Sequence, residues 1–214
     1  MRARPILFNG PMVRALLDGS KTQTRRVVKS KFEIDYLPLD LDGPIWPHHS
    51  TYSDAFEDQP MLCPYGQPGD RLWVREAHYL TDDGHSEFAV YAADDDATQK
   101  HLQRLDGLNA DFPADVKAAH KRLRPSIHMP RWASRITLEI VKVRVERLQD
   151  ISDLDAKAEG SPDYQEGIDE PAPGEGYEWS FRKSYRRLWE TINGAGTWEA
   201  NPWVWVIEFK KATA

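Results

Sequence analysis

The chain has 214 residues, of which 40% are apolar and 29% charged, and its formal net charge is −6. This length suits one domain with insertions or at most two small domains, and the 8 Trp, 8 Tyr and 7 Phe supply bulky side chains for a core. The composition excludes a disordered chain, a collagen-like repeat and a simple coiled coil. The negative net charge excludes a uniformly basic surface for nucleic acid. A local basic patch is still compatible with this charge.

The predicted elements are, in chain order, a strand at 5–8, a helix at 11–18, strands at 70–80 and 87–92, a weaker helix at 114–123, a strand at 135–148, helices at 152–160 and 179–192, and a strand at 202–210. The first helix can be capped by Asn9 and ended by Gly19. Ser152 can cap the helix that follows it. The apolar alternation changes phase between Ile140 and Val141, which predicts a β-bulge or a bend there.

These elements favour one α+β domain over residues 1–214. Strands separated by short helices and rich in β-branched residues are typical of a small mixed β-barrel with flanking helices, rather than a doubly wound parallel sheet. No glycine-rich turn between a strand and a helix supports a dinucleotide fold. Residues 35–69 and 161–176, rich in Pro and in polar or acidic residues, are expected to be long loops.

The hydrophobic pattern of the sequence predicts neither a membrane span nor an export signal. No apolar run approaches the length of a membrane span, and no long apolar stretch follows the two arginines near the start. The single cysteine, Cys63, cannot form a disulfide within the chain, so a reducing cytoplasm is expected. The sequence also lacks a phosphate-binding loop, paired zinc cysteines and a His-Glu-x-x-His motif, so we expect no metal and no organic cofactor.

Charge is segregated along the chain. Residues 21–31 hold five basic residues and no acid, and residues 117–135 hold six basic residues, two histidines and no acid. Residues 150–178 instead hold ten acids and one lysine. Two basic runs that converge in space would form a phosphate-binding surface, whereas each run alone is also compatible with a solvated face.

The segment richest in candidate chemistry is Gly19-Ser20-Lys21-Thr22-Gln23-Thr24-Arg25-Arg26, directly after the first predicted helix. Its lysine, threonines and arginines gather hydrogen-bond donors that can hold a phosphate or a nucleobase edge. The alternative is a basic strand with its charges in water. A guanidinium and an indole side by side at Arg131 and Trp132 can also stack on a base, although a core position suits the tryptophan equally well.

Residues 17–26 resemble the opening signature of the ASCH domain, a relative of the PUA RNA-binding fold. That signature, Gly-x-Lys-Thr-x-Thr-x-Arg, is matched by Gly19, Lys21, Thr22, Thr24 and Arg26. Other segments that are similar to the family are 68–74, 148–159 and 204–209, and segment 125–132 is similar to long ASCH proteins encoded in phage and prophage genomes. The resemblance implies a PUA-like barrel with a cleft for RNA or a modified nucleoside, and insertions at about 30–65, 93–124 and 161–178 outside the common core.

Some small ASCH proteins are amidohydrolases that remove the acetyl group from N4-acetylcytidine. The resemblance carries their catalytic set onto Lys21, Thr24 and Glu159. A threonine hydroxyl needs a base, and Lys21 can be that base only if its pKa is lowered, as burial and Arg25 and Arg26 would do and Glu159 would oppose. Because residues three apart lie on opposite faces of a strand, Lys21 and Thr24 need a turn or a bulge to cooperate.

Three functions therefore stay open. The first is binding of RNA or a modified nucleoside in a basic cleft. Its candidate nucleotide-binding residues are Lys21, Thr22, Arg25, Arg26, Arg75, His128, Arg131 and Trp132. The second is amide hydrolysis on an N-acylated nucleoside, and the third is a phage accessory protein whose acidic loop, 163–178, binds a host protein.

Overall fold

The computed structural model of the protein describes residues 2–29, 34–35, 48–49, 62–82, 86–107, 118, 120–161 and 180–212. The strands and α-helices are β1 (Ala3–Leu7), α1 (Gly10–Asp18), β2 (Gln23–Val27), β3 (Ile34–Asp35), β4 (His48–His49), β5 (Arg71–Arg75), β6 (His78–Asp82), β7 (Glu87–Tyr91), α2 (Asp95–Asp106), β8 (Thr137–Arg147), α4 (Asp153–Ala158), α5 (Phe181–Asn193) and β9 (Trp203–Lys211). Short 3-10 helices are η1 (Ser126–His128), η2 (Arg131–Ala133) and η3 (Leu148–Asp150). Within these described ranges no helix is long and apolar enough to cross a membrane.

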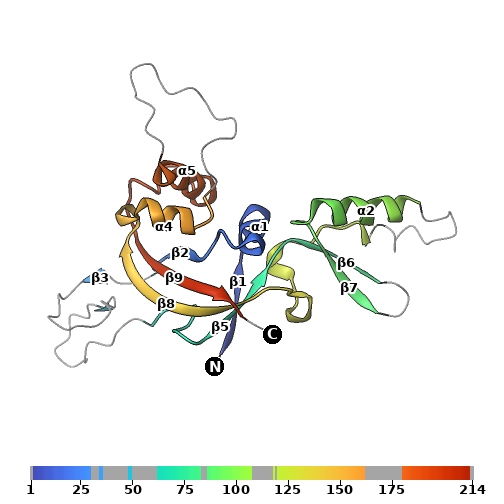
Figure 1. Cartoon of the computed structure of the whole chain (residues 1–214), viewed down its shortest axis with the longest axis horizontal. Helices are drawn as coiled ribbons and strands as arrows, with labels where there is room; N and C mark the ends of the chain where they lie inside the picture. Colours follow the sequence, from blue (N-terminus) through green and yellow to red (C-terminus); the bar gives the residue numbers. More distant parts are fainter. Residues whose placement is uncertain are drawn as a thin grey trace, which may run out of the picture.

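A five-stranded mixed sheet forms the centre of the molecule, in the order β1-β5-β8-β9-β2. β1 runs parallel to β5, and the other neighbours are antiparallel. In Figure 1, α4 and α5 lie together at one end of β8 and β9, whereas the β6–β7 hairpin and α2 form an arm on the other side. The predicted α+β class is confirmed. β1 and β2 are the outer strands and no ladder joins them in the described part of the chain, so this sheet is open and the predicted barrel stays a prediction.

Several local predictions are confirmed. The Asn9 side chain accepts a hydrogen bond from the Met12 N–H at the start of α1, and Gly19 ends that helix with φ 87°. The Ser152 hydroxyl accepts a bond from the Asp155 N–H at the start of α4. The register between β8 and β9 shifts between Ile140 and Lys142, where the sequence predicts a bulge.

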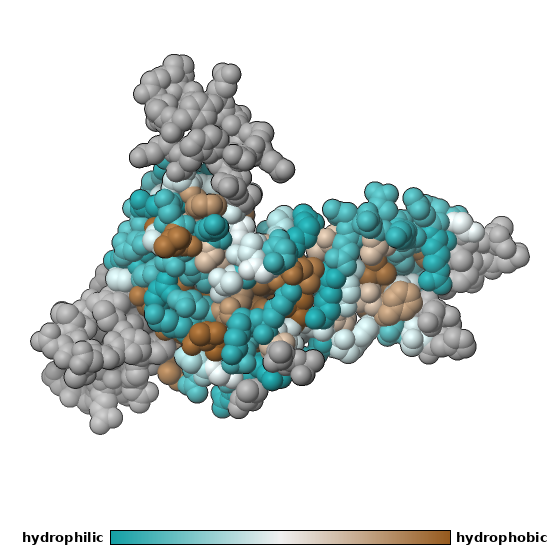
Figure 2. Space-filling model, in the orientation of Figure 1, coloured by the Kyte–Doolittle hydropathy of each residue, from teal (hydrophilic) through white to brown (hydrophobic). Residues whose placement is uncertain are grey.

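Other predictions differ from the structure. The strand predicted at 70–80 is two strands, because the chain leaves the sheet after Arg75 and starts the β6–β7 hairpin at His78. Helix α2 was not predicted, since it buries only His101 and Leu105 and so lacks a strong apolar periodicity. Figure 2 shows hydrophilic residues along the α2 edge of this arm and several hydrophobic ones below that edge. Three sets of residues lie outside the described ones: 114–117 and 119 of the helix predicted at 114–123, 36–47 and 50–61 of the loop predicted at 35–69, and the whole acidic loop 163–178.

Two apolar cores lie on opposite faces of the sheet. The first packs α1 against the sheet, and the second packs α4 and α5 against its other face. Strand β9 serves both, because Trp205 and Ile207 belong to the first core and Val204 and Val206 to the second. Each fully buried side chain of this size contributes about 1.5–3 kcal/mol. The second core therefore fixes α4 and α5 beside β2, which carries the opening motif.

Candidate functional site

The opening motif is joined tightly to the end of α4. Lys21 lies just before β2 and forms an isolated β-bridge with Glu159. The Thr22 N–H donates to the Ala158 carbonyl at 2.8 Å. Gly160 has φ 74°, and a Cβ there would lie 2.9 Å from the Ala15 Cβ and 3.0 Å from the Lys21 Cβ. Only glycine allows this close approach, which brings Lys21 and Glu159 together from positions 138 residues apart.

The Lys21 ammonium group is completely buried and fully hydrogen-bonded. It donates to the Gln23 carbonyl at 2.9 Å, to the Glu159 carbonyl at 2.7 Å and to Glu159 Oε2 at 2.9 Å. Burial lowers the pKa of Lys21 below that of an ordinary lysine, and the negative charge of Glu159 opposes this shift. The group is therefore held in place by three acceptors while its charged form is disfavoured by desolvation.

A second cation holds the other oxygen of the same carboxylate. Arg25 Nη1 donates to Glu159 Oε1 at 3.1 Å, and the same guanidinium also pairs with Glu146 and Asp155. We call Lys21, Arg25, Glu146, Asp155 and Glu159 the β2 ion cluster. Burial alone lowers the pKa of Arg25, but the charges of Glu159 and Glu146 raise it, so Arg25 stays charged.

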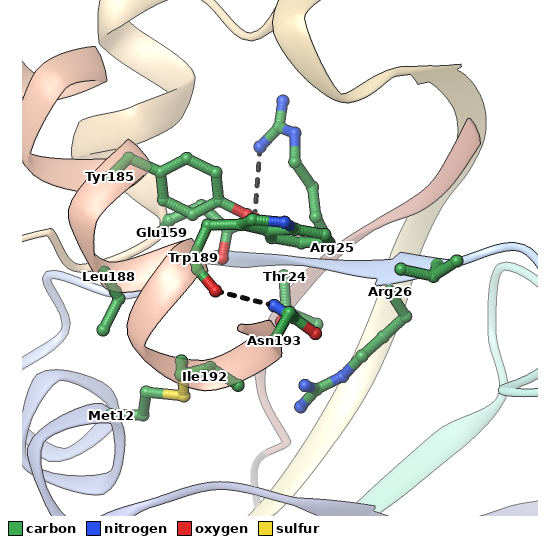
Figure 3. Close-up of a pocket in the computed structure, with 11 residues that line it drawn as sticks. Met12, Thr24, Arg25, Arg26, Glu159, Tyr185, Leu188, Trp189, Ile192 and Asn193 are labelled. Carbon is green, nitrogen blue, oxygen red and sulfur yellow. Dashed lines mark hydrogen bonds and ion pairs between the residues drawn. The ribbon is translucent and has the colours of Figure 1, made fainter. Parts of the chain in front are cut away.

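A small cavity of about 50 Å³ lies beside the β2 ion cluster, between β2 and α5 (Figure 3). Its polar lining includes Thr24, Glu159 and Asn193, and its apolar lining includes Met12, Leu188 and Ile192. Ligand sites for whole small molecules usually measure about 300–1,000 Å³. This cavity therefore suits a small chemical group rather than an entire nucleoside.

Two of the three predicted catalytic residues line this cavity. Thr24 and Glu159 line it, and Lys21 holds Glu159 from outside the lining. Lys21 precedes β2, and its Nζ bonds the Gln23 carbonyl and Glu159 rather than the Thr24 hydroxyl. Thr24 is 1% exposed.

The predicted nucleotide-binding residues of the motif have different surroundings. Lys21 and Arg25 have fully buried side chains paired with carboxylates, so a phosphate could reach them only after those pairs were broken. Thr22 is exposed, and Arg26 is half-buried. Arg26 donates from Nη2 to the Leu7 carbonyl at 2.6 Å and lies over the Phe8 ring.

Of the remaining nucleotide-binding candidates, Arg75 and Arg131 form a second group over the ring of Trp73. The guanidinium carbons of Arg75 and Arg131 lie 5.0 and 5.4 Å from the centre of its ring. Trp132 is 53% exposed, and His128 is exposed on η1. The two groups approach each other at β1, because the Phe8 N–H bonds the Arg75 carbonyl and Arg26 bonds the neighbouring Leu7.

Sequence reasoning missed several residues around the cavity. Tyr185 and Trp189 were interpreted as the buried face of a helix, which is correct, but they also line the cavity. Asn193 contributes from the last turn of α5. No local signal connects these residues with a motif at 19–26, because only the second core brings α5 to β2.

In the part of the chain that the structure describes, no group of three or more His, Cys, Asp or Glu side chains is arranged to hold a metal ion. Cys63 is buried, and burial raises the pKa of its thiol, as expected for an inert cysteine. Comparisons of the chain with protein-family models, with curated proteins and with solved structures gave no match.

Proposed function

We propose that the protein hydrolyses a small N-acyl group from a modified nucleoside, such as N4-acetylcytidine, at the cavity between β2 and α5. One observation carries this proposal: Thr24 and Glu159 line the same cavity, and Lys21, distant in sequence from Glu159, bonds that carboxylate at 2.9 Å. Perturbed ionisable groups beside a cavity are typical of catalytic sites. The resemblance of residues 17–26 to the ASCH signature supports a catalytic role for the same three residues. It also supports a distant relation between this sheet and PUA-like barrels.

In the proposed reaction, Thr24 is the nucleophile and Lys21 is its base. The neutral Lys21 amine accepts the hydroxyl proton as Thr24 Oγ1 adds to the acyl carbonyl carbon. The resulting ammonium returns that proton to the amine nitrogen as the C–N bond breaks, and water then hydrolyses the acyl-threonine ester. Burial supports the role of Lys21 because it lowers the pKa of the ammonium. Glu159 orients Lys21, and Arg25 holds the other oxygen of the same carboxylate.

The test is mass spectrometry on N4-acetylcytidine with the wild type, Lys21→Ala and Lys142→Ala. Lys142 is an exposed lysine of β8 and serves as the matched control. We expect turnover by the wild type and the control, and a loss of about 100-fold or more in Lys21→Ala, as for removal of a general base. An inactive wild type, or an active Lys21→Ala, would contradict the proposal.

A second candidate function, binding of single-stranded RNA, is favoured by the surface around Trp73. Two guanidinium groups lie over this indole, and Trp132, which follows Arg131 in the chain, is half exposed. Arginines and exposed aromatic rings are the usual contacts for single strands. We expect the Arg75→Ala and Arg131→Ala double variant to weaken binding to an RNA oligonucleotide and to reduce its salt dependence. Salt-independent binding would contradict this function.

A further inference from the structure

We infer that the free edge of β1, the side away from β5, binds a short extended peptide that carries two acidic residues separated by one residue. The peptide adds to the sheet as a further strand, and Arg2 and Arg4 pair with its two carboxylates. β1 and β2 are the two ends of the five-stranded sheet. The inferred site is therefore at the opposite edge from the cavity, and it does not depend on the proposed hydrolysis.

The backbone of β1 leaves one row of hydrogen-bonding groups for another strand. At its start, the Arg71 N–H donates to the Arg2 carbonyl at 2.8 Å. At its end, the Phe8 N–H donates to the Arg75 carbonyl at 3.1 Å. Because the backbone groups of successive strand residues point to opposite sides, the even-numbered residues of β1 bond β5 and the odd-numbered ones face the free edge. The exposed Ala3 therefore offers both its N–H and its carbonyl there.

Pro5 limits how far an added strand can pair. It also faces the free edge, but proline has no N–H, so it offers only its carbonyl. Further along, the Leu7 carbonyl already accepts a hydrogen bond from Arg26. Proline on an outer strand commonly prevents open-ended pairing of sheet edges. The free edge of β1 therefore suits a short peptide centred on Ala3 rather than a second full-length strand.

Two cations lie on one face of β1. Side chains alternate along a strand, so Arg2 and Arg4 are on the same face as Ile6, which belongs to the first core. Arg2 is exposed and Arg4 is half-buried. Among the described residues, no carboxylate forms an ion pair with either guanidinium group. Charge complementarity therefore selects an acidic occupant.

An open groove of about 560 Å³ lies along this edge, and its lining consists of Arg2, Ala3, Arg4, Pro5, Pro64 and Tyr65. Such a volume is usual for ligand sites, which measure about 300–1,000 Å³. The wall of the groove is fixed to β1, because Arg4 Nη1 donates to the Pro64 carbonyl at 2.6 Å. The neighbouring Asp70 accepts the Arg2 N–H at 2.8 Å. In Figure 1 this end of β1 lies beside the label N.

The register of the added strand fixes the spacing of the two acids. In an antiparallel pair, one peptide residue exchanges both backbone hydrogen bonds with Ala3, and its two neighbours lie opposite Arg2 and Arg4. The side chains of these neighbours share a face with the two arginines, at about 4.5–5.5 Å between Cβ atoms. A carboxylate at each position forms a charge-assisted hydrogen bond with a guanidinium group. The recognised pattern is therefore acid-x-acid, with x opposite Ala3.

Fluorescence anisotropy with labelled peptides tests the spacing and the backbone bonds. The probe is Thr-Val-Glu-Val-Glu-Val-Thr with blocked ends. Its controls are the isomer Thr-Val-Val-Glu-Glu-Val-Thr and the probe methylated on the backbone nitrogen between the two glutamates, which can no longer bond the Ala3 carbonyl. We expect both controls to bind about tenfold more weakly, a difference of one lost interaction. A probe that does not bind, or a control that binds equally well, would overturn the inference.

Variants of the chain test the position of the site. The double variant Arg2→Ala and Arg4→Ala removes the cations, Ala3→Pro removes the N–H at the free edge, and the control Arg104→Ala changes an exposed arginine of α2. We expect a loss in affinity of about tenfold or more in the first two and none in the control. Thermal unfolding shows whether each variant is folded, and the double variant decides if Ala3→Pro is not. An unchanged affinity in the double variant, or an equal loss in Arg104→Ala, would overturn the inference.

Two other occupants are distinguished in the same assay. Inorganic triphosphate, added at the same total charge as the probe, should not displace it, because triphosphate cannot pair with the backbone of Ala3. Displacement would show a general anion surface and overturn the peptide site. The affinity for the probe should also be independent of protein concentration. An affinity that falls as the protein concentration rises would show that a second copy of the chain occupies the edge instead.

Discussion

Two buried ion clusters in this protein have similar chemistry but different neighbours. The β2 ion cluster joins the motif to α4 and borders the cavity. A second set, Glu76, Asp94 and Arg135, which we call the junction cluster, lies where the sheet meets the β6–β7 arm. There Arg135 donates to both oxygens of Glu76 at 2.9 and 3.0 Å and also pairs with Asp94. Its guanidinium carbon lies 3.9 Å from the centre of the Tyr91 ring.

The comparison shows that a buried ion pair by itself is weak evidence for a site. Both clusters bury a glutamate almost completely, Glu76 at 1% and Glu159 at 2% exposure. Burial of such pairs often costs as much desolvation energy as their attraction returns. What distinguishes the β2 ion cluster is the adjoining cavity, which Thr24 and Glu159 line. We therefore assign chemistry to this cluster and a structural role to the junction cluster.

The largest expected effect comes from Glu159→Gln. This change leaves Lys21 and Arg25 buried with less negative charge, and we expect a loss of about 3–5 kcal/mol in the free energy of unfolding. Turnover should also be lost. Urea denaturation measures the first and mass spectrometry on N4-acetylcytidine the second. A stable, active variant would remove the difference between the two clusters.

Glu76→Gln should have a smaller effect. Arg135 would still pair with Asp94, and the amide oxygen of the new glutamine could still accept a hydrogen bond from it. We expect a loss of about 1.5–3 kcal/mol in unfolding free energy, with kcat per folded molecule unchanged. The same denaturation and turnover assays apply. A fall in kcat at temperatures where the variant is fully folded would show that the junction cluster takes part in function.

A histidine next to the junction cluster predicts that the stability of the fold depends on pH. Burial, together with the charge of Arg124, lowers the pKa of His78 below its ordinary value of 6.5, although a bond to the Glu76 carbonyl opposes this. The unfolded chain then binds a proton that the folded chain does not, so stability is full above pH 6.5 and falls as the pH drops below it. Unfolding curves between pH 5.5 and 8 should show this slope, and His78→Phe should flatten it; an equal slope in both proteins would refute the prediction.

The smallest effect is expected for an exposed pair between α5 and the segment that follows this helix. Arg186 and Glu199 form an ion pair with side chains 48% and 55% exposed. Glu199→Gln should change the unfolding free energy by about 0.2–1 kcal/mol. Thermal unfolding in low and high salt measures it, since salt screens only the exposed pair strongly. A loss as large as that of Glu76→Gln would mean that burial does not separate these interactions.

Local patterns predicted much of the fold but little of the site geometry. The caps at Asn9 and Ser152 and the bulge after Ile140 follow from residues a few positions apart, and all three are confirmed. The break between β5 and β6 was missed, because Glu76 is buried by its partner Arg135, 59 residues further on. The positive charges of Lys21 and Arg25 predict a phosphate-binding surface. In the structure both charges are paired with carboxylates that are distant in the sequence.

The sequence by itself determined the α+β class and the main helices and strands, whereas the three residues proposed to act together come from the resemblance to the ASCH signature. These depend on spacing, capping and side-chain type, which are local properties of the chain. Only the tertiary structure decided that Lys21 is buried against Glu159 and that α5 closes a cavity over Thr24. Burial and long-range pairing depend on which elements the two cores bring together, and no local pattern contains that information.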